Sequence, residues 1–186
     1  MESPDTPWAK RHDERLKKRF EEPPSRGAVF FLEFLKGKGI GGGRLVDIGC
    51  GNGRNAIFFA NEGFEVHAVD KSDEVLKDMD LHGVMPHCHS ITDYWFFEDG
   101  FFDIAMDCFC YSEQADAGRK SFYREQLSRV LKDGGYYLLC VEEGSGTHET
   151  MAKEFAAFAT LSSLSFEDTV NGKKKKALAI IMQKKS

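Results

Sequence analysis

The residues best suited to chemistry form a glycine-rich loop with an acidic residue just before it. Gly49, Gly51 and Gly53 follow the apolar run 44–48, and Asp47 stands two positions before the first glycine. Because glycine has no Cβ, such a loop can turn sharply and let the backbone approach a ligand closely. A strand before the loop and a helix after it are the context that nucleoside-binding loops require. The pattern therefore predicts a nucleoside site at this loop.

A second acidic residue, Asp70, comes directly after the next apolar run, residues 64–69. It lies 21 positions after Gly49. In an open α/β sheet the ligand crevice lies beyond the carboxyl ends of the strands, where both the loop and Asp70 are expected. A carboxylate in this place can accept hydrogen bonds from both hydroxyls of a ribose.

The spacing of the loop distinguishes between two kinds of nucleoside. An NAD site favours Gly-x-Gly-x-x-Gly, with the pyrophosphate at a helix N-terminus. Here the spacing is Gly-x-Gly-x-Gly, and the carboxylate of Asp47 would repel a pyrophosphate. A ligand with a cationic amino group or a sulfonium suits that carboxylate, which favours S-adenosylmethionine.

Strands and helices alternate along the chain, which predicts an α/β fold. The predicted strands are residues 44–48, 64–69, 84–89, 102–106, 136–141, 165–170 and 177–182. The predicted helices are residues 10–20, 26–36, 54–62, 72–81, 119–131 and 147–161. Asn171-Gly172 is a hairpin signal, so the last strand should be antiparallel. We expect a Rossmann-like, doubly wound, seven-stranded and mainly parallel sheet that ends in an antiparallel hairpin strand.

With these motifs in place, the chain resembles the class I S-adenosylmethionine-dependent methyltransferase superfamily over residues 26–184. The resemblance rests on segments 46–53, 63–70, 99–104 and 130–136. Within the superfamily, Gly53-Arg54-Asn55-Ala56 and the upstream Trp8 and Asp13-Glu14-Arg15 are similar to the small tellurite-resistance and thiopurine-methyltransferase-like branch.

The resemblance implies a role for individual residues in binding S-adenosylmethionine. The loop would hold the methionine part, Asp70 the ribose, and Lys71 would lie beside the adenine. The family usually has an acid after the third strand for the adenine amino group; here Ser90 and Ile91 stand there, with Asp93 close by. Asp107 would face the methionine amino group or the acceptor. The implied cofactor-binding residues are Asp47, Gly49, Cys50, Gly51, Gly53, Arg54, Asn55, Asp70, Lys71, Ser90, Ile91 and Asp107.

Methyl transfer from a sulfonium needs positioning more than a protein nucleophile. A thiol or metalloid anion can arrive deprotonated, whereas an amine or hydroxyl benefits from a base. Asp107, Glu142 and His148 are the candidate bases near strand ends, and Tyr111 follows the fourth predicted strand in a segment that should face the crevice. Asp107, Tyr111 and Glu142 are therefore the candidate catalytic residues.

Two further clusters invite a metal or soft-ligand interpretation. His87-Cys88-His89 puts two histidines on one strand face, but these residues do not complete a tetrahedral site, so no metal is expected. Cys108 and Cys110 should face the reaction crevice, where a thiol could bind a metalloid oxyanion. Small apolar residues lining a pocket are the favoured interpretation.

The composition limits the partners and the location of the protein. The 186 residues carry a formal net charge of −5 with a pI of about 5.7, which argues against electrostatic binding of nucleic acid. No apolar run is long enough to cross a membrane, and the N-terminus lacks the features of a signal peptide. Five cysteines, an odd number, fit reduced thiols in the cytoplasm. Lysines 173–176 are expected to protect a sheet edge.

We expect residues 1–25 to form a helical N-terminal segment that acts as a lid, and residues 26–186 to form the methyltransferase domain. The short tail after the fifth strand leaves no room for a substrate domain, so the acceptor should be small: a thiol, a metalloid oxyanion or a small amine. The protein is expected to be a monomer or a homodimer. A non-catalytic binder of S-adenosylmethionine or S-adenosylhomocysteine and an NAD-dependent oxidoreductase are the alternatives.

Overall fold

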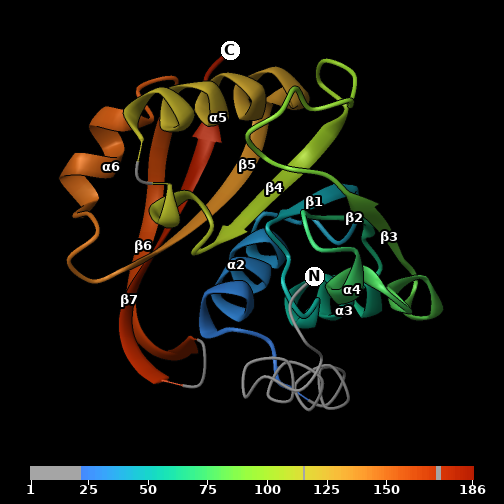
Figure 1. Cartoon of the computed structure of the whole chain (residues 1–186). Coiled ribbons are helices and arrows are strands. Elements are labelled where there is room, and N and C mark those ends of the chain that lie inside the picture. Colours follow the sequence, from blue (N-terminus) through green and yellow to red (C-terminus); the bar gives the residue numbers. More distant parts are fainter. Residues whose placement is uncertain (1–21, 115, 171–172) are drawn as a thin grey trace, which may run out of the picture.

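A computed structural model describes residues 22–114, 116–170 and 173–186. The predicted helix 10–20 and most of the predicted lid lie outside these residues. Figure 1 shows one mixed sheet with helices on both faces. The helices are α2 (Arg26–Gly37), α3 (Arg54–Asn61), α4 (Asp73–Leu76), α5 (Ala117–Val130) and α6 (His148–Glu154), with short 3-10 turns η1 (Met79–His82) and η2 (Tyr111–Glu113).

The seven strands have the order β3-β2-β1-β4-β5-β7-β6. They are β1 (Arg44–Ile48), β2 (Glu65–Asp70), β3 (Val84–Cys88), β4 (Phe102–Cys108), β5 (Leu131–Glu142), β6 (Phe158–Val170) and β7 (Lys173–Lys184). Strands β1 to β5 pair in parallel, and β7 pairs antiparallel with both β5 and β6. The predicted sheet is confirmed, including its strand number and its antiparallel C-terminal hairpin.

Each face of the sheet is covered by helices (Figure 1), and an apolar core lies beneath them on each side. Helices α2, α3 and α4 pack on one face, where Phe31 and Phe59 are fully buried. Helices α5 and α6 pack on the other, where Tyr123 and Phe155 are buried. Successive strand side chains point to opposite faces, so a strand covered on both sides is apolar at nearly every position. Asp47 and Asp107 therefore stand out as buried acids in otherwise apolar strands.

The order of the strands places a crevice at one end of β1. The chain runs from β1 to β2 and β3 on one side and then crosses to β4 on the other. Ligands of open α/β sheets bind where the strand order reverses in this way, outside the carboxyl ends of the strands. Helix α2 begins after Ser25, whose side chain caps it by accepting a hydrogen bond from Ala28 N.

Two predicted helices differ from the observed ones. The helix predicted over 72–81 is broken into α4 and η1 by Asp78, whose φ of 63° is left-handed, a conformation that Asp tolerates better than most residues. The helix predicted over 147–161 ends at Glu154, because Phe158 begins the long ladder with β7. Pairing with a distant strand satisfies the backbone there, and no local pattern reveals that partner.

The four consecutive lysines at 173–176 lie at the start of β7, in the part of the hairpin that extends beyond β5. Lys175 pairs with Glu142, and the Lys176 ammonium lies 3.9 Å from the Glu143 carboxylate. This part of β7 pairs with β6 but not with β5, whose pairing starts at Ala177, so one side of the strand is an edge here, as expected for these lysines. Within the described residues, no helix is both long and apolar enough to span a membrane.

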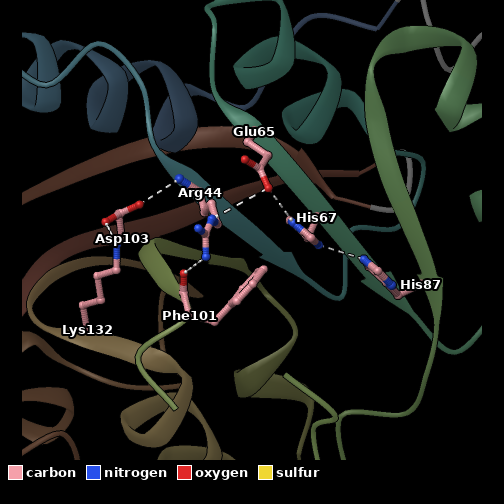
Figure 2. A network of polar contacts seen from close by, with 7 residues as sticks. All are labelled: Arg44, Glu65, His67, His87, Phe101, Asp103 and Lys132. Atoms are coloured by element: carbon pink, nitrogen blue, oxygen red, sulfur yellow. Dashed lines mark hydrogen bonds and ion pairs between the residues drawn. The ribbon is translucent and has the colours of Figure 1, made fainter. Parts of the chain in front are cut away.

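A chain of polar contacts crosses the opposite end of the sheet (Figure 2). It runs from Lys132 through Asp103, Arg44 and Glu65 to His67. His67 Nδ1 then lies 2.9 Å from Nε2 of His87, and the two rings stack with centroids 5.1 Å apart. Only one hydrogen fits between the two nitrogens. The contact therefore excludes the state in which both rings are positively charged imidazolium ions, because each ring would then carry a hydrogen on both of its nitrogens.

The histidine pair predicts a loss of stability in mild acid. Burial lowers the pKa of His67 and of His87, although Glu65 acts in the opposite direction on His67. The unfolded chain therefore takes up protons first, and the free energy of unfolding should fall as the pH drops below about 6.5. Each pKa unit of lowering corresponds to about 1.4 kcal/mol. Thermal unfolding between pH 5 and pH 7.5 measures this effect.

The double variant His67→Phe, His87→Phe should unfold with a weaker acid dependence than the natural chain. His148→Gln, which changes an exposed histidine, is the matched control and should keep the natural dependence. Parallel pH curves for the natural chain and the double variant would contradict this interpretation.

Candidate functional site

A cavity of about 440 Å³ opens at the carboxyl ends of β1, β2 and β4. Six of its lining residues are among the predicted cofactor-binding residues: Gly49, Gly51, Asp70, Lys71, Ser90 and Ile91. The others are Thr92, Cys108, Phe109, Cys110, Glu113, Gln114 and Arg119. We call this the strand-end cavity.

The glycine loop needs its glycines for two separate reasons. Gly49, Gly51 and Gly53 have φ values of 68°, 52° and 78°, in the left-handed region where other residues are strained. A Cβ on Gly49 would lie 2.5 Å from Cys110 Sγ, and one on Gly53 would lie 2.5 Å from Met79 Cε. A Cβ on Gly51 would meet nothing within 4 Å among the described atoms, because this residue borders the open cavity.

Asp47 lies beneath this loop with an unsatisfied oxygen. Asp47 is 2% exposed, and within the described part of the chain its Oδ2 atom has no hydrogen-bond partner. Burial first, and then the charges of Asp107 and Asp70, raise its pKa to about 8. Buried polar atoms almost always find a partner. An orphaned acid oxygen beside a cavity therefore fits a site built to face a cationic group.

Asp70 is held rigidly at the end of β2. Its Oδ2 accepts a hydrogen bond from Gly51 N at 3.0 Å, and its Oδ1 accepts one from Ser72 N at 3.0 Å. An ionised carboxylate has about four acceptor positions, so both oxygens keep the capacity to accept from a ligand. The two backbone bonds tie this carboxylate to the glycine loop, which sets the distance between the two parts of the site.

The residues after β3 form another wall of the strand-end cavity. Ser90 Oγ lies 2.8 Å from Thr92 Oγ1, and Trp95 Nε1 donates a hydrogen bond to Ile91 O at 3.1 Å. Lys71 adds an exposed cation to this wall. Asp93 is exposed and is not part of the cavity lining. This wall therefore offers hydroxyl and backbone groups, together with one ammonium.

Asp107 lies under the cavity and not in it, which differs from its expected position. Its carboxylate is fully buried and accepts hydrogen bonds from Cys110 N at 2.8 Å, Tyr111 N at 3.0 Å and Tyr123 Oη at 2.7 Å. Burial raises its pKa to about 7, while these donors act in the opposite direction. Asp107 holds the turn after β4, in which Phe109 has the strained φ of 81°.

The other two expected catalytic residues are also engaged elsewhere. Tyr111 is fully buried, and its hydroxyl contacts the Glu154 carboxylate and Arg124 Nη1. Glu142 pairs with Lys175 on the hairpin. None of these side chains lines the strand-end cavity. The candidate base His148 lines a second cavity of about 600 Å³, between the start of α2, the 143–148 loop and the hairpin.

Three residues of the predicted cofactor site serve the scaffold around the loop. Arg54 Nη2 lies 3.2 Å from Asp168 Oδ2 on β6. Asn55 is buried and its Oδ1 accepts a hydrogen bond from Ser25 N at 2.8 Å, which joins α3 to the start of α2. Cys50 is buried, and burial raises the pKa of its thiol. These contacts fix the position of the loop.

Sequence reasoning missed Thr92, Glu113, Gln114 and Arg119. Glu113 and Gln114 follow the tight turn after β4, and Arg119 lies in the first turn of α5, which Asp116 caps. The position of Glu113 and Gln114 just after a strand end was the one available signal. Arg119 lines the cavity because of the way α5 packs, and no local sequence pattern predicts that packing.

Comparison with known proteins agrees with the fold. A family model described as a methyltransferase domain matches residues 45–135, from β1 to the first part of β5. The search of curated proteins gave no match. A methyltransferase structure from Methanosarcina mazei, described as SAM-dependent, superposes with a TM-score of 0.69 and 18% identity, covering 78% of this chain and 93% of that chain.

A second similar structure is 1,6-didemethyltoxoflavin-N1-methyltransferase from Burkholderia thailandensis, with 1,6-didemethyltoxoflavin and S-adenosylhomocysteine bound. It has a TM-score of 0.71 and 17% identity, and the match covers 100% of this chain and 92% of that chain. A putative sarcosine dimethylglycine methyltransferase from Galdieria sulphuraria has a TM-score of 0.70 and 13% identity over 86% of both chains. At these identities the likeness establishes a common fold.

The buried acid beneath the loop predicts a pH effect on the ligand-free protein. Because the pKa of Asp47 is about 8 in the fold and 3.8 ordinarily, the native state keeps a proton that the unfolded state loses. This contribution to stability is fully present below about pH 4 and is lost as the pH rises to 8. Asp47→Asn should therefore gain stability over the natural chain across that range. We expect a gain of at least about 1 kcal/mol at pH 8, or about 2–4 °C in Tm.

Thermal unfolding of both proteins from pH 4 to pH 9 measures the difference. Asp73→Asn, which changes an exposed acid at the start of α4, is the control and should follow the natural chain. A constant offset between Asp47→Asn and the natural chain across this range would count against the raised pKa.

Proposed function

We propose that this chain, a methyltransferase with S-adenosylmethionine as its cofactor, methylates a small-molecule acceptor. The observation that carries the proposal is the pairing of an orphaned buried carboxyl, Asp47, with a second carboxylate, Asp70, on the next strand end. One acid suits the positive charge of the donor and the other suits its ribose. Asp70 and the loop residues Gly49 and Gly51 line the strand-end cavity, whose volume of about 440 Å³ suits small ligands, and Asp47 lies beneath that loop.

The proposed roles follow from the position of each group. The bare backbone at Gly51 would lie against the methionine part, with the Asp47 carboxyl below it. Asp70 would accept hydrogen bonds from the ribose hydroxyls with the acceptor positions that its backbone bonds leave free. Ser90 and Ile91, with Lys71, would border the adenine. When bound, S-adenosylmethionine supplies a methyl group on a sulfonium, which is a good leaving group.

The remaining cavity residues would orient the acceptor. Cys108, Phe109 and Cys110 form the part of the lining that follows β4, and Glu113, Gln114 and Arg119 continue it. Holding the acceptor in line with the methyl group can lower the barrier by about 7–11 kcal/mol. The turn that carries these residues is fixed from below by the hydrogen bonds to Asp107.

The acceptor class follows from the lack of a free base among the expected catalytic residues. Asp107 and Tyr111 are buried and hydrogen-bonded, and Glu142 is paired with a lysine. An acceptor that arrives deprotonated, a thiol or a metalloid oxyanion, is therefore favoured over a small amine, which benefits from a base. The N1-methyltransferase with 1,6-didemethyltoxoflavin bound shows that this fold accommodates a small acceptor.

The same proposal extends to the type of acceptor, the partners and the location of the protein. The similarity of segment 53–56 to the tellurite-resistance and thiopurine-methyltransferase-like branch supports a small, soft acceptor. The acidic net charge of −5 supports a protein that does not bind nucleic acid. A cytoplasmic location, a monomer or homodimer, and a lid formed by residues 1–25 complete the proposal.

Asp70→Ala should weaken the binding of S-adenosylhomocysteine. Loss of hydrogen bonds to a charged acceptor costs on the order of 1.5–3 kcal/mol, which corresponds to a Kd about 10–150 times higher. Isothermal titration calorimetry gives the Kd, and circular dichroism checks the fold. Asp93→Ala, an exposed acid outside the cavity lining, is the matched control and should bind as the natural chain does.

Equal affinity of a folded Asp70→Ala variant and the natural chain would place the ribose elsewhere. Titration with NAD under the same conditions gives a further check. Tight binding of NAD without binding of S-adenosylhomocysteine would favour the oxidoreductase alternative.

A screen of thiols, metalloid oxyanions and small amines should release S-adenosylhomocysteine with at least one acceptor. With that acceptor, Tyr111→Phe and Glu142→Gln should keep kcat/KM within about threefold of the natural chain, whereas loss of a general base lowers rates by about 10²–10⁴. A loss of that size in a folded variant would show that the substituted residue takes part in catalysis. Binding of S-adenosylhomocysteine without turnover of any acceptor would favour the non-catalytic binder.

A further inference from the structure

Two cysteine thiols face one another at the carboxyl ends of neighbouring strands. Cys108 ends β4 and is directly paired with Cys140 of β5 in the parallel ladder. Their sulfur atoms lie 3.6 Å apart. Adjacent strands are about 4.8 Å apart, within the Cα separations of about 4.4–6.8 Å that disulfides span. The backbone is thus already placed for a bond between the two sulfurs.

The two cysteines differ in their access to solvent. Cys108 is half-buried and lines the strand-end cavity, whereas Cys140 is 0% exposed. The start of α2 covers the pair, because Ser25 Oγ lies 3.8 Å from Cys108 Sγ and a Cβ on Gly27 would lie 2.6 Å from Cys140 Sγ. An oxidant that enters the cavity reaches the first thiol, and the second is held behind it.

We propose that Cys108 and Cys140 are a redox modification site, which a hydroperoxide converts into a reversible intramolecular disulfide. The Cys108 sulfur attacks the peroxide oxygen, the O–O bond breaks, and water leaves as the sulfenic acid forms. The Cys140 sulfur then attacks Cys108 Sγ, the S–O bond breaks, and a second water leaves. Two thiols are oxidised and one hydrogen peroxide is reduced to two waters.

The environment of Cys140 explains why Cys108 reacts first. Cys140 is shielded from solvent, and the hydrogen bond with Cys108, and then burial, raise the pKa of its thiol well above the ordinary value. In the second step the Cys140 proton passes to the hydroxyl that leaves Cys108, and the two depart together as water. A dithiol reductant reverses the reaction by thiol–disulfide exchange.

Formation of the disulfide should be linked to occupancy of the strand-end cavity. The sulfurs must close from 3.6 Å to about 2.05 Å, which draws Cys108 Sγ away from the cavity wall and from Ser25. A ligand that fills the cavity covers the same thiol. This part of the inference rests on the proposed function, since the ligand is S-adenosylhomocysteine.

The first experiment uses the full chain with Cys88→Ser, which removes the exposed cysteine of β3. The protein is treated with hydrogen peroxide, its free thiols are alkylated, and the linked peptides are identified by mass spectrometry. We expect a Cys108–Cys140 link that a dithiol reductant removes. Cys110→Ser, which changes the other cavity thiol, should keep this link, and Cys108→Ser should lose it.

Oxidation that links Cys108 to a cysteine other than Cys140, or that converts Cys108 to sulfinic acid with Cys140 still free, would overturn the proposal. Peptide mapping of the chain that keeps both cysteines is decisive even where a variant does not fold. Cys140→Ala, checked by circular dichroism, should convert the product from a disulfide to a stable sulfenic acid at Cys108.

The second experiment repeats the oxidation with saturating S-adenosylhomocysteine, after calorimetry has established binding. We expect the disulfide to form at least about fivefold more slowly. An unchanged rate with the ligand bound would overturn the link to the cavity. Failure of the ligand to bind at all would count against the proposed function, whereas the disulfide itself is decided by the first experiment.

Discussion

The structure depends on the meeting of three acidic side chains where three parallel strands end. Asp47, Asp70 and Asp107 come from β1, β2 and β4, which are neighbours in the sheet. Burial, and then the charges of Asp107 and Asp70, raise the pKa of Asp47 to about 8, and burial raises the pKa of Asp107 to about 7. Backbone N–H groups donate to Asp70 and Asp107, whereas one oxygen of Asp47 has no partner among the described residues. The fold thus keeps an unmet electrostatic demand at its crevice, which a cationic donor would satisfy.

The three acids also show why residue type alone does not assign a role. Asp70 reaches the cavity because it lies at the last position of β2, whereas Asp107 precedes the last residue of β4 and points to the opposite layer. There it meets Tyr123 and the backbone of the turn at 110–111. One position along a strand reverses the direction of a side chain. An acid expected in the crevice therefore becomes the support beneath it.

Most of the fold was predictable from the sequence because its signals are local. Alternating apolar runs and glycine turns gave all seven strands, and the Asn171-Gly172 signal gave the antiparallel hairpin. The glycine loop and Asp70 were predictable because their position depends only on where a strand ends, whereas Lys71, Ser90 and Ile91 were implied by the resemblance to the methyltransferase superfamily. The end of α6 was not, since Phe158 pairs with Lys184 across the hairpin. Nor were the places of Tyr111 and Arg119, which depend on how α5 and α6 pack.

The difference between positions set by local signals and positions set by packing explains why the methyl donor is easier to infer from a sequence than the acceptor. The proposed donor side of the cavity is built from strand ends and backbone, so its chemistry is fixed by the sheet. The proposed acceptor side is built from a turn and the start of a helix, namely Phe109, Glu113, Gln114 and Arg119. That turn is held in a strained conformation by a buried carboxylate and lies outside the strand ladder, so a change of its side chains would leave the sheet intact. A scaffold of this kind can carry different acceptor sites on one fold, and the two similar structures share this fold although their names give different small molecules.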